Sequence, residues 1–321
     1  MNKIDHSYTP VALFVYNRLD NTKRVIEALK NNELAPETEV FVFSDAAKDE
    51  RQSAKVQAVR DYLKTTTGFK SFTVIERPYN YYIEKNIIDG VTEIVNKYGK
   101  IIVLEDDGVT AKNFLTFMNN ALDYYENHGK VMHVATFTFI KMPPDFNKTF
   151  LWRYSENTGG GWGTWKRAWS KFKWFQTEDE GLSELSPEQI SKIELDGTFT
   201  CLGSLKLKPI PWDICWYITI VKNNGLAVNS PWALTKNNGL FNGTHTGPLN
   251  KILGKHPLDV ELNEEKEIIF ENEISENHMA IDLLKDFYSK YGRRKRDKIL
   301  NFFVKILVKL KITKLLKRIL K

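Results

Sequence analysis

The sequence has few cysteines and no long apolar run, and each shortage excludes a class of protein. Cys201 and Cys215 are the two cysteines in 321 residues, and their spacing fits neither a disulfide framework nor a zinc motif. We therefore expect buried thiols in a reducing compartment. No stretch of eighteen uninterrupted apolar residues is present, so we expect no membrane-spanning helix. The first ten residues, MNKIDHSYTP, contain no apolar core, so we expect no secretory signal.

The chain also lacks the glycine pattern that dinucleotide-binding domains place after their first strand. The first apolar run, PVALFVY at 10–16, leads into Asn17 and Arg18 rather than into GxGxxG. This absence disfavours an NAD-binding domain. The same segment, YNRLDNTKR, is not glycine-rich, which also counts against a nucleotidyltransferase with a glycine-rich phosphate loop.

Basic charge is scarce in most of the chain and gathers at one end. The formal net charge is +6. The segment 293–321 has twelve Lys or Arg and one acid, Asp297, so it contributes +11 and leaves −5 for the rest. A nucleic-acid-binding protein is expected to have its basic charge on the folded body. We therefore expect no nucleic-acid partner.

Four apolar runs separated by helical patterns predict a mostly parallel sheet covered by helices on both faces. The runs are 10–16, 39–45, 71–78 and 100–107, and the helical patterns between them are 21–32, 50–64 and 84–98. Asp20 is expected to cap the first helix. Ligands of such sheets bind beyond the carboxyl ends of the strands. The polar residues at those ends are Asn17, Arg18, Ser44, Asp45, Glu76, Arg77 and Glu105–Asp107.

After residue 130 the periodicity weakens. SENTGGGWGTWKRAW, at 155–169, is expected to be a glycine-rich loop that leads into a tryptophan-rich helix, and PWDICWYITIVKNNG, at 211–225, an amphipathic helix. We expect one composite domain over 1–250, with halves 1–130 and 131–250. A polar peripheral extension is expected over 251–292, followed by the basic tail 293–321.

Three adjacent carboxylates, Glu105, Asp106 and Asp107, end the fourth apolar run in the sequence IIVLEDDG. Crowded acids raise each other's pKa unless a cation is present. Hard oxygen ligands suit Mn²⁺ or Mg²⁺, and such ions share their coordination sphere with phosphates. A solvated turn is the alternative, because LEDDG is also acceptable turn chemistry. The buried run before it and the helical pattern after it favour a metal site.

Five segments resemble, in order, those of GT-A-fold glycosyltransferases. They are PVALFVYNR, VFVFSD, KIIVLEDDGVTAKNFLTFM, LWRYSENTGGGWGTW and PWDICWY. The layout is similar to the N-acetylglucosaminyltransferase I family and to bacterial glycosyltransferases of surface-polysaccharide clusters. The resemblance implies a GT-A fold, a Rossmann-like and mostly parallel α/β sheet flanked by helices. One segment, RPYNYYIEKN at 77–86, has no counterpart that aligns with this pattern.

The resemblance also implies roles on the donor side. Arg18 would contact the nucleotide, and Asp45 would accept a hydrogen bond from the base, which is uracil in that family. Glu105 and Asp106 would serve the ribose and nearby groups. Asp107 would bind Mn²⁺ or Mg²⁺ directly.

On the acceptor side the resemblance implies that Asp213 is the general base. The alternative is that Asp213 only caps the N-terminus of the helix. His245 would be a second metal ligand, or a solvent-facing histidine in a polar loop. Glycines allow the backbone to approach a ligand closely. Gly161 would therefore lie at the boundary between donor and acceptor, with Trp162 or Trp165 stacking on a sugar.

The C-terminal sequence KILNFFVKILVKLKITKLLKRILK has lysines at helical spacing among apolar residues. We expect a basic amphipathic helix over 293–321 that lies on an anionic membrane surface. A coiled coil, or docking of this helix on the mildly acidic body, is the alternative.

These features together predict an inverting, metal-dependent glycosyltransferase that uses a nucleotide sugar, specifically a UDP-sugar. The expected acceptor is a lipid-linked saccharide of bacterial capsule or O-antigen biosynthesis, and the expected location is the cytoplasmic face of the cell membrane. Two alternatives are a non-catalytic, membrane-associated saccharide-binding module on the same scaffold and a nucleotidyltransferase.

Overall fold

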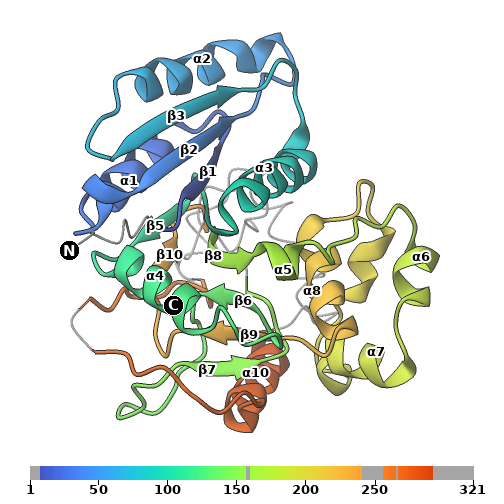
Figure 1. Cartoon of the computed structure of the whole chain (residues 1–321). Helices are drawn as coiled ribbons and strands as arrows, with labels where there is room; N and C mark the ends of the chain where they lie inside the picture. Colours follow the sequence, from blue (N-terminus) through green and yellow to red (C-terminus); the bar gives the residue numbers. More distant parts are fainter. Residues whose placement is uncertain (1–7, 157–159, 241–255, 265–266, 292–321) are drawn as a thin grey trace, which may run out of the picture.

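The computed structural model describes residues 8–156, 160–240, 256–264 and 267–291. Its first part alternates strands with helices (Figure 1). In chain order these are β1 (Val11–Val15), α1 (Leu19–Lys30), β2 (Glu39–Ser44), α2 (Glu50–Lys64), β3 (Ser71–Glu76), α3 (Tyr82–Tyr98) and β4 (Lys100–Glu105). The predicted alternation is confirmed. The capping prediction is wrong, because α1 begins at Leu19 with Arg18 at its N-cap, and Asp20 lies inside the first turn.

The second part has shorter strands and less regular connections. Its strands are β5 (Gly108–Thr110), β6 (Val131–Ala135), β7 (Phe150–Trp152), β8 (Gly160–Trp165), β9 (Leu226–Asn229) and β10 (Thr235–Asn237). Its α-helices are α4 (Phe114–Tyr124), α5 (Lys166–Trp169), α6 (Glu178–Ser183), α7 (Pro187–Ile193), α8 (Trp212–Lys222) and α10 (His278–Tyr291). Short 3₁₀ turns occur at Ala35–Glu37, Leu195–Gly197 and Leu202–Lys206.

Eight strands form one mixed sheet in the order β3-β2-β1-β4-β8-β6-β9-β7. The four strands β3, β2, β1 and β4 are mutually parallel. β8 runs antiparallel to both β4 and β6, and β7 runs antiparallel to β9. β10 pairs with β5 in a separate two-stranded sheet. The mainly parallel α/β architecture expected for a GT-A fold is therefore present.

Apolar side chains cover both faces of the large sheet. On one face, residues of α1, α2 and α4 pack with β1, β2 and β4 in a single cluster. On the other, residues of α3, α5 and α8 pack against the same strands. Every residue of β1 is buried, as expected for a strand covered on both sides. The packing of helices on both faces fixes the carboxyl ends of β1, β2 and β4 at one edge of the sheet.

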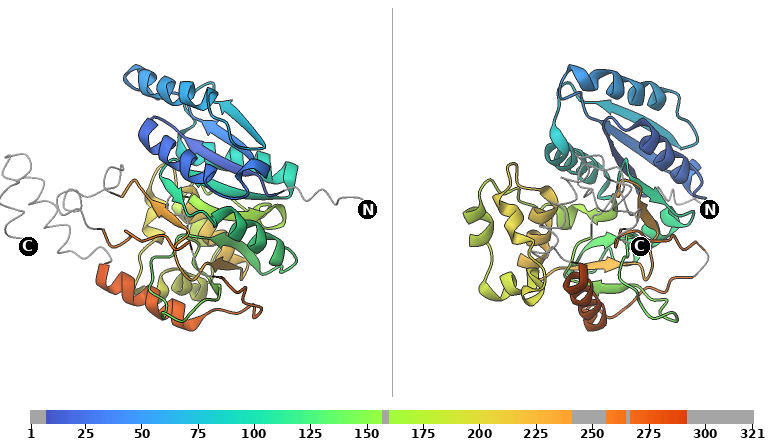
Figure 2. Two further views of the ribbon diagram at one scale, coloured as in Figure 1. Left: turned by 90° about the vertical axis from the view of Figure 1, so that its left-hand side faces the viewer. Right: turned by 180° about the vertical axis from the view of Figure 1, so that it is seen from behind.

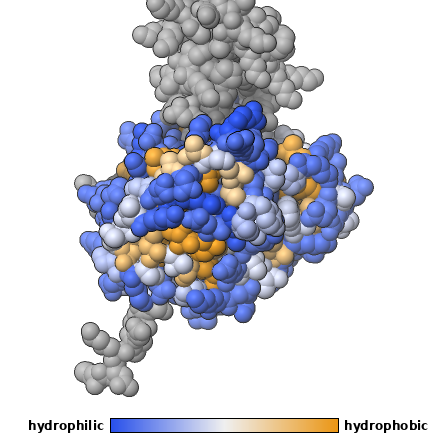
Figure 3. Space-filling view, turned by 90° about the horizontal axis from the view of Figure 1, so that it is seen from above, coloured by the Kyte–Doolittle hydropathy of each residue, from blue (hydrophilic) through white to orange (hydrophobic). Residues whose placement is uncertain are grey.

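The edge strand β3 is only half-covered. All its residues are partly or fully exposed. Figure 3 views the molecule from above Figure 1, where α2 and β3 lie, and shows a mostly hydrophilic surface with smaller apolar patches. This edge is thus less apolar than the buried strands beside it.

The glycine-rich segment forms a central strand rather than the loop expected from its composition. Gly160 has φ of +83°, and a Cβ placed on it would lie 2.6 Å from the backbone nitrogen of Glu105. Only glycine tolerates both the left-handed backbone and this close approach. The ladder between β4 and β8 is irregular at the same point, between Val103 and Leu104. The glycines therefore bring β8 against the end of β4.

The segment after residue 267 packs on the body. The backbones of Thr149 and Asn147 exchange hydrogen bonds with Ile269, at 2.8 and 2.9 Å. Helix α10 lies against β7, at the end of the molecule opposite α2 (Figure 2), and buries Ala280 and Leu284 completely. The polar composition of 251–292 gave no indication of this packing.

In the described ranges, no helix is both long and apolar enough to cross a membrane. The basic tail 293–321 lies outside the described residues, so the amphipathic helix stays a prediction. Helix α8 is described, and it is not amphipathic. Trp212 and every residue from Cys215 to Val221 are buried, because α8 packs between the sheet and the helices of the second part.

Candidate active site

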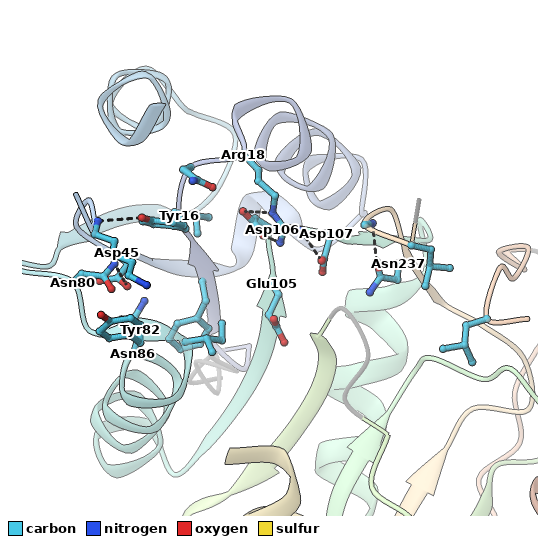
Figure 4. A pocket seen from close by; sticks show the side chains of 18 of the residues that line it. Tyr16, Arg18, Asp45, Asn80, Tyr82, Asn86, Glu105, Asp106, Asp107 and Asn237 are labelled. Carbon is cyan, nitrogen blue, oxygen red and sulfur yellow. Dashed lines mark hydrogen bonds and ion pairs between the residues drawn. The ribbon is translucent and has the colours of Figure 1, made fainter. Parts of the chain in front are cut away.

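A cavity of about 750 Å³ opens at the carboxyl ends of β1, β2 and β4. Five of the predicted site residues line it together: Arg18, Asp45, Glu105, Asp106 and Asp107. Figure 4 shows Asp45 at one end of the cavity and Asp107 toward the other, with Arg18 between them. The convergence expected from the sheet topology therefore brings the donor-side residues into one cavity.

Arg18 neutralises two of the three adjacent acids. Its Nε lies 3.2 Å from Asp106 Oδ2, and its Nη2 donates to Asp106 Oδ1. Its Nη1 lies 3.1 Å from Asp107 Oδ2. Burial raises the pKa of Asp106 to about 6, although the Arg18 guanidinium acts in the opposite direction. Because Arg18 follows β1 directly and the acids end β4, the pairing of these neighbouring strands creates the contact.

Asp107 has an oxygen that fits a metal ion. Its Oδ1 is buried and has no hydrogen-bond partner among the described residues. A buried carboxylate oxygen without a partner is unfavourable in water-free surroundings, and a divalent cation would satisfy it. No group of three His, Cys, Asp or Glu that could hold a metal exists in the part of the chain that the structure describes. One or two carboxylates suffice, however, when substrate phosphates supply the other ligands.

Asp45 is held rigidly at the other end. Its Oδ1 accepts hydrogen bonds from the backbone nitrogens of Ala46, at 2.9 Å, and Tyr81, at 2.8 Å. Its Oδ2 accepts one from Asn80 Nδ2 at 3.0 Å. Burial raises the pKa of Asp45, and backbone donors from Tyr81, Ala46 and Tyr82 oppose that rise. The carboxylate is therefore fixed as a hydrogen-bond acceptor that faces the cavity.

Glu105 points away from Arg18 in Figure 4. Its carboxylate has no hydrogen bond or ion pair within the described ranges. Burial raises its pKa well above the ordinary value, and the charges of Asp107, Asp106 and Asp213 raise it further. Asp213 also raises the pKa of Glu84, after the larger effect of burial. Glu84 and Glu105 therefore each lie within electrostatic reach of Asp213.

Asp213 lies in the first turn of α8 and is not its N-cap, a position that Pro211 takes. Its Oδ1 accepts a hydrogen bond from the backbone nitrogen of Ile214 at 2.9 Å. It does not line the main cavity. Its charge nevertheless raises the pKa of Glu105, which lines that cavity.

The stacking role expected for Trp162 and Trp165 is wrong for this conformation. Trp162 is 0% exposed and Trp165 is 2% exposed, so neither ring offers a face to a sugar. Trp162 instead stacks on Trp212, with ring centroids 5.2 Å apart. Trp165 donates a hydrogen bond from Nε1 to the Leu122 carbonyl at 3.0 Å. Trp162 thereby supports the start of α8, which carries Asp213.

Gly161 is also packed rather than open to a ligand. A Cβ placed on it would lie within 2.6 Å of side-chain atoms of both Thr136 and Thr235. The expected acceptor contact at Gly161 therefore has no space in this conformation. His245 lies outside the described residues, so its assignment as a metal ligand stays a prediction.

Several residues that line the cavity were not predicted as site residues from the sequence. They are Tyr16, Lys48, Asn80, Tyr82, Ile83, Asn86, Asn237, Gly239, Leu240, His256 and Leu258. Four of them lie in RPYNYYIEKN, the segment that did not align, and a run of aromatic and amide residues after a strand was the available signal. Asn237, Gly239 and Leu240 reach the cavity because β10 pairs with β5, and the Asn238 nitrogen donates to the Asp107 carbonyl at 2.7 Å.

Comparison with known proteins decides the family. The model described as "Glycosyl transferase family 2" matches residues 11–180, which is more than half of the chain. The chain belongs to this family. It is therefore a glycosyltransferase, an enzyme of a family that transfers sugars from nucleotide-sugar donors to saccharide acceptors. This membership sets aside the nucleotidyltransferase.

Two solved structures are similar to the glycosyltransferase over part of their length. The mannosyltransferase PcManGT from Pyrobaculum calidifontis, in complex with GDP-Man and Mn²⁺, is 17% identical over 50% of this chain, with a TM-score of 0.33. S. aureus TarS is 12% identical over 90% of this chain, with a TM-score of 0.36. The chain spans 45% of the length of each. No curated protein matches it. The closer resemblance to the N-acetylglucosaminyltransferase I family stays a prediction.

Proposed function

We propose that this glycosyltransferase transfers a sugar from a UDP-sugar to a saccharide acceptor, with inversion at the anomeric carbon and with a divalent cation bound. The observation that carries the proposal is the cavity itself. A fixed acceptor for a base, Asp45, lies at one end, and a buried oxygen without a partner, on Asp107, lies at the other. A nucleoside diphosphate has a base and a charged pyrophosphate at its two ends.

Asp107, with the substrate diphosphate, would hold Mn²⁺ or Mg²⁺. Such an ion supplies Lewis-acid stabilisation of the negative charge that develops on the leaving diphosphate. Arg18 binds and orients the nucleotide, because its guanidinium lies between the base end and the acids. Asp106 fixes Arg18 through two hydrogen bonds. Glu105 and Asp106 accept hydrogen bonds from ribose or sugar hydroxyls.

Asp213 is the proposed general base. The acceptor oxygen attacks the anomeric carbon as the bond from that carbon to the diphosphate oxygen breaks, and the electron pair leaves with the diphosphate. The hydroxyl proton passes to the Asp213 carboxylate. A single displacement of this kind inverts the anomeric configuration. The rigid first turn of α8, supported by the stacked Trp212 and Trp162, holds the carboxylate in place.

The proposed acceptor class and cellular location rest on the basic C-terminal segment 293–321. A segment with a charge of +11 is expected to bind the anionic inner face of a bacterial cell membrane. A lipid-linked saccharide of capsule or O-antigen biosynthesis would be presented at that surface. We therefore propose this acceptor class and a peripheral location on the cytoplasmic face of the membrane. We also propose domain limits of 1–250, 251–292 and 293–321.

A panel of nucleotide sugars tests the donor proposal. We expect hydrolysis of a UDP-sugar in the presence of Mn²⁺, and none when the metal is chelated. Binding to the folded state also raises the melting temperature by mass action. If no nucleotide sugar in the panel is hydrolysed or raises the melting temperature, the proposed donor class is wrong.

Vesicle co-sedimentation tests the membrane proposal separately. The full chain is expected to sediment with vesicles that contain phosphatidylglycerol, whereas a chain that ends at Tyr291 is expected to stay in the supernatant. Equal sedimentation of both chains would contradict the role of the tail.

A further inference from the structure

One wall of the cavity is built by described residues of the segment 237–258, none of which was predicted as a site residue from the sequence. They are Asn237, Gly239, Leu240, His256 and Leu258. Figure 4 shows Asn237 beyond Asp107 as seen from Asp45. A ligand with its base at Asp45 and its charged group at Asp107 would therefore meet this wall with a part that is far from the base.

Backbone contacts hold the end of β10 against Asp107. Asn237 pairs with Gly108 in the ladder between β10 and β5. The Asn238 nitrogen donates to the Asp107 carbonyl oxygen at 2.7 Å. A Cβ placed on Gly239 would lie 2.7 Å from Asp107 Oδ2, so the Gly239 backbone packs closely against this carboxylate. Asn237 is thereby fixed at the acid end of the cavity.

Asn237 presents its NH₂ group, and not its oxygen, to the cavity. Its Oδ1 accepts a hydrogen bond of 2.7 Å from the Gly239 nitrogen. A backbone N–H can only donate, so the amide oxygen faces Gly239 and the NH₂ group faces the other way. Within the described ranges this NH₂ group has no acceptor. Because Asn237 lines the cavity, an oxygen of a bound ligand is a suitable partner for it.

An ion pair fastens the turn at 256–259 to β10. Lys236 Nζ lies 3.0 Å from Asp259 Oδ1, and the Asp259 nitrogen donates to the His256 carbonyl oxygen at 2.9 Å. Lys236 directly precedes Asn237 in β10. This ion pair therefore brings His256 to the same wall of the cavity as Asn237, and both residues are half-buried.

His256 is also a donor, because one of its ring nitrogens is already an acceptor. Its Nδ1 accepts a hydrogen bond of 3.1 Å from the Leu258 nitrogen. Burial lowers the pKa of His256, although Asp259 acts in the opposite direction, so the ring is neutral at pH 7. A neutral imidazole that accepts at Nδ1 carries its proton on Nε2. The ring then has no lone pair left for a metal ion.

Neutral donors suit this part of the cavity better than further cations would. Glu105, Asp106 and Asp107 line the cavity, and Arg18 already pairs with the two aspartates. A diphosphate brings more negative charge, which needs hydrogen-bond donors. A lysine or a second arginine would repel the divalent cation proposed on Asp107. The N–H groups of an amide and a neutral imidazole can bind phosphate oxygens without this repulsion.

We propose that Asn237 and His256 bind the β-phosphate of the donor as a pair of neutral hydrogen-bond donors, and that His256 acts through Nε2–H and not as a metal ligand. This inference rests on the proposed nucleotide-sugar donor. The β-phosphate is the phosphate farther from the base, and it keeps the electron pair when its bond to the anomeric carbon breaks. Hydrogen bonds to its oxygens strengthen as this negative charge develops.

Calorimetry with UDP and with UMP, each with Mn²⁺, tests the proposal, because UMP has no β-phosphate. Asn237→Asp keeps an acceptor for the Gly239 nitrogen but replaces the NH₂ group with a carboxylate oxygen. We expect it to weaken UDP binding by roughly 10-fold to 100-fold, because a carboxylate then faces a phosphate. UMP binding should change by less than about 3-fold. The matched control is Asn272→Asp at an exposed position, which should bind both nucleotides as the wild-type protein does.

Two substitutions at His256 distinguish a hydrogen-bond donor from a metal ligand. His256→Gln keeps an N–H group near the position of Nε2, whereas His256→Ala removes it. We expect His256→Ala to weaken UDP binding by about 10-fold, and His256→Gln to stay within about 3-fold of the wild-type protein. Titration of Mn²⁺ in the presence of UMP should give the wild-type affinity for both variants. His278→Ala, at an exposed position, is the control.

The other results separate this inference from the proposed function. Equal losses of UDP binding in His256→Gln and His256→Ala, with weaker Mn²⁺ binding in both, would make His256 a metal ligand and overturn its assignment. If the wild-type protein binds UDP but neither Asn237→Asp nor His256→Ala weakens that binding, the donor pair is overturned and the proposed function stands. Equal losses for UDP and UMP also overturn the pair, because the contact is then not with the β-phosphate.

Two further results complete the test. If the wild-type protein does not bind UDP, the proposed function falls, and the donor pair falls with it. If a melting curve shows that one of the two substituted positions does not tolerate its change, the variants at the other position still decide the matter.

Discussion

The large sheet has two sides along its strand order, one that ends at β4 and one that begins at β8, and they are built in different ways. On one side, β3, β2, β1 and β4 are parallel and alternate with helices, and residues at the ends of β1, β2 and β4 form the cavity. On the other, β8, β6, β9 and β7 run in mixed directions, and none of the described residues that line the cavity belongs to these strands. The first side presents polar groups to a ligand. The second side holds them in place through buried glycine and aromatic contacts.

The largest effect is expected from the cavity side, at the residue that fits a metal. Asp107→Asn keeps the shape of the side chain but removes its charge. We expect the transfer rate to fall by about 1000-fold or more, because metal stabilisation of a leaving group contributes several kcal/mol. The control is Asp123→Asn, whose exposed carboxylate pairs with Lys100. Equal rates in the two variants would show that the cavity side does not hold the metal.

The next largest effect is expected at Asp213, which the second side of the sheet positions. Asp213→Asn removes the proposed base, so kcat is expected to fall by about 100-fold to 1000-fold. Binding of UDP should change by less than about 3-fold, since Asp213 does not line the donor cavity. The measurements are steady-state rates with a saccharide acceptor and calorimetry with UDP. A loss of UDP binding without a loss of kcat would mean that Asp213 binds the donor and is not the general base.

A glycine series tests how the second side is packed against the first. Gly160→Ala combines a φ of +83° with a 2.6 Å contact to Glu105, so we expect it to lower the free energy of unfolding by roughly 3 kcal/mol. Gly197→Ala has a φ of +87° but no atom within 4 Å, so it should cost about 1 kcal/mol. Gly203→Ala has neither feature and should be close to neutral. Urea unfolding measures all three, and equal values would mean that β8 is not held by close contact with β4.

The smallest effect is a pH dependence that comes from the second side. Burial lowers the pKa of His133 from 6.5 to about 4, and its ring is satisfied in the neutral form by Trp216 Nε1 and the Glu156 carbonyl. The unfolded chain therefore takes up the proton first as the pH falls. We expect the free energy of unfolding to lose up to about 3 kcal/mol between pH 6.5 and 4 from this residue.

The variant His133→Gln isolates that contribution. It should be less stable at pH 7, and its stability should fall less steeply between pH 6.5 and 4 than that of the wild-type protein. His278→Gln, at an exposed position, is the control and should keep the wild-type slope. If His133→Gln also keeps that slope, His133 is not held in the neutral form.

The same comparison explains what could be predicted from the sequence. The helices and strands from β1 to β4 follow local periodicity, and polar residues at parallel strand ends must converge, so Arg18, Asp45 and Asp107 were found. β8 was missed because glycine has low strand propensity. Its conformation is set by pairing with β4 and β6, which are distant in sequence.

The Trp162 and Asn86 environments also depend on distant contacts. Trp162 was expected to stack on a sugar, but Trp212, fifty residues later, covers its ring. The Asn86 amide oxygen accepts a hydrogen bond from Arg77, which follows β3, so the environment of Asn86 also depends on a contact outside its own helix. Neither contact leaves a periodic signal in the sequence. Tertiary packing, and not local propensity, determines this part of the site.

The central claim is that the carboxyl ends of β1, β2 and β4 form one site for a divalent cation and a nucleoside diphosphate. Titration calorimetry of Mn²⁺ into the protein, with and without UDP, tests it most directly. We predict that UDP tightens Mn²⁺ binding by at least about 10-fold and that Mn²⁺ tightens UDP binding by the same factor, as reciprocal linkage requires. Mn²⁺ affinity that is unmeasurable in both titrations, or that UDP leaves unchanged, would contradict the claim.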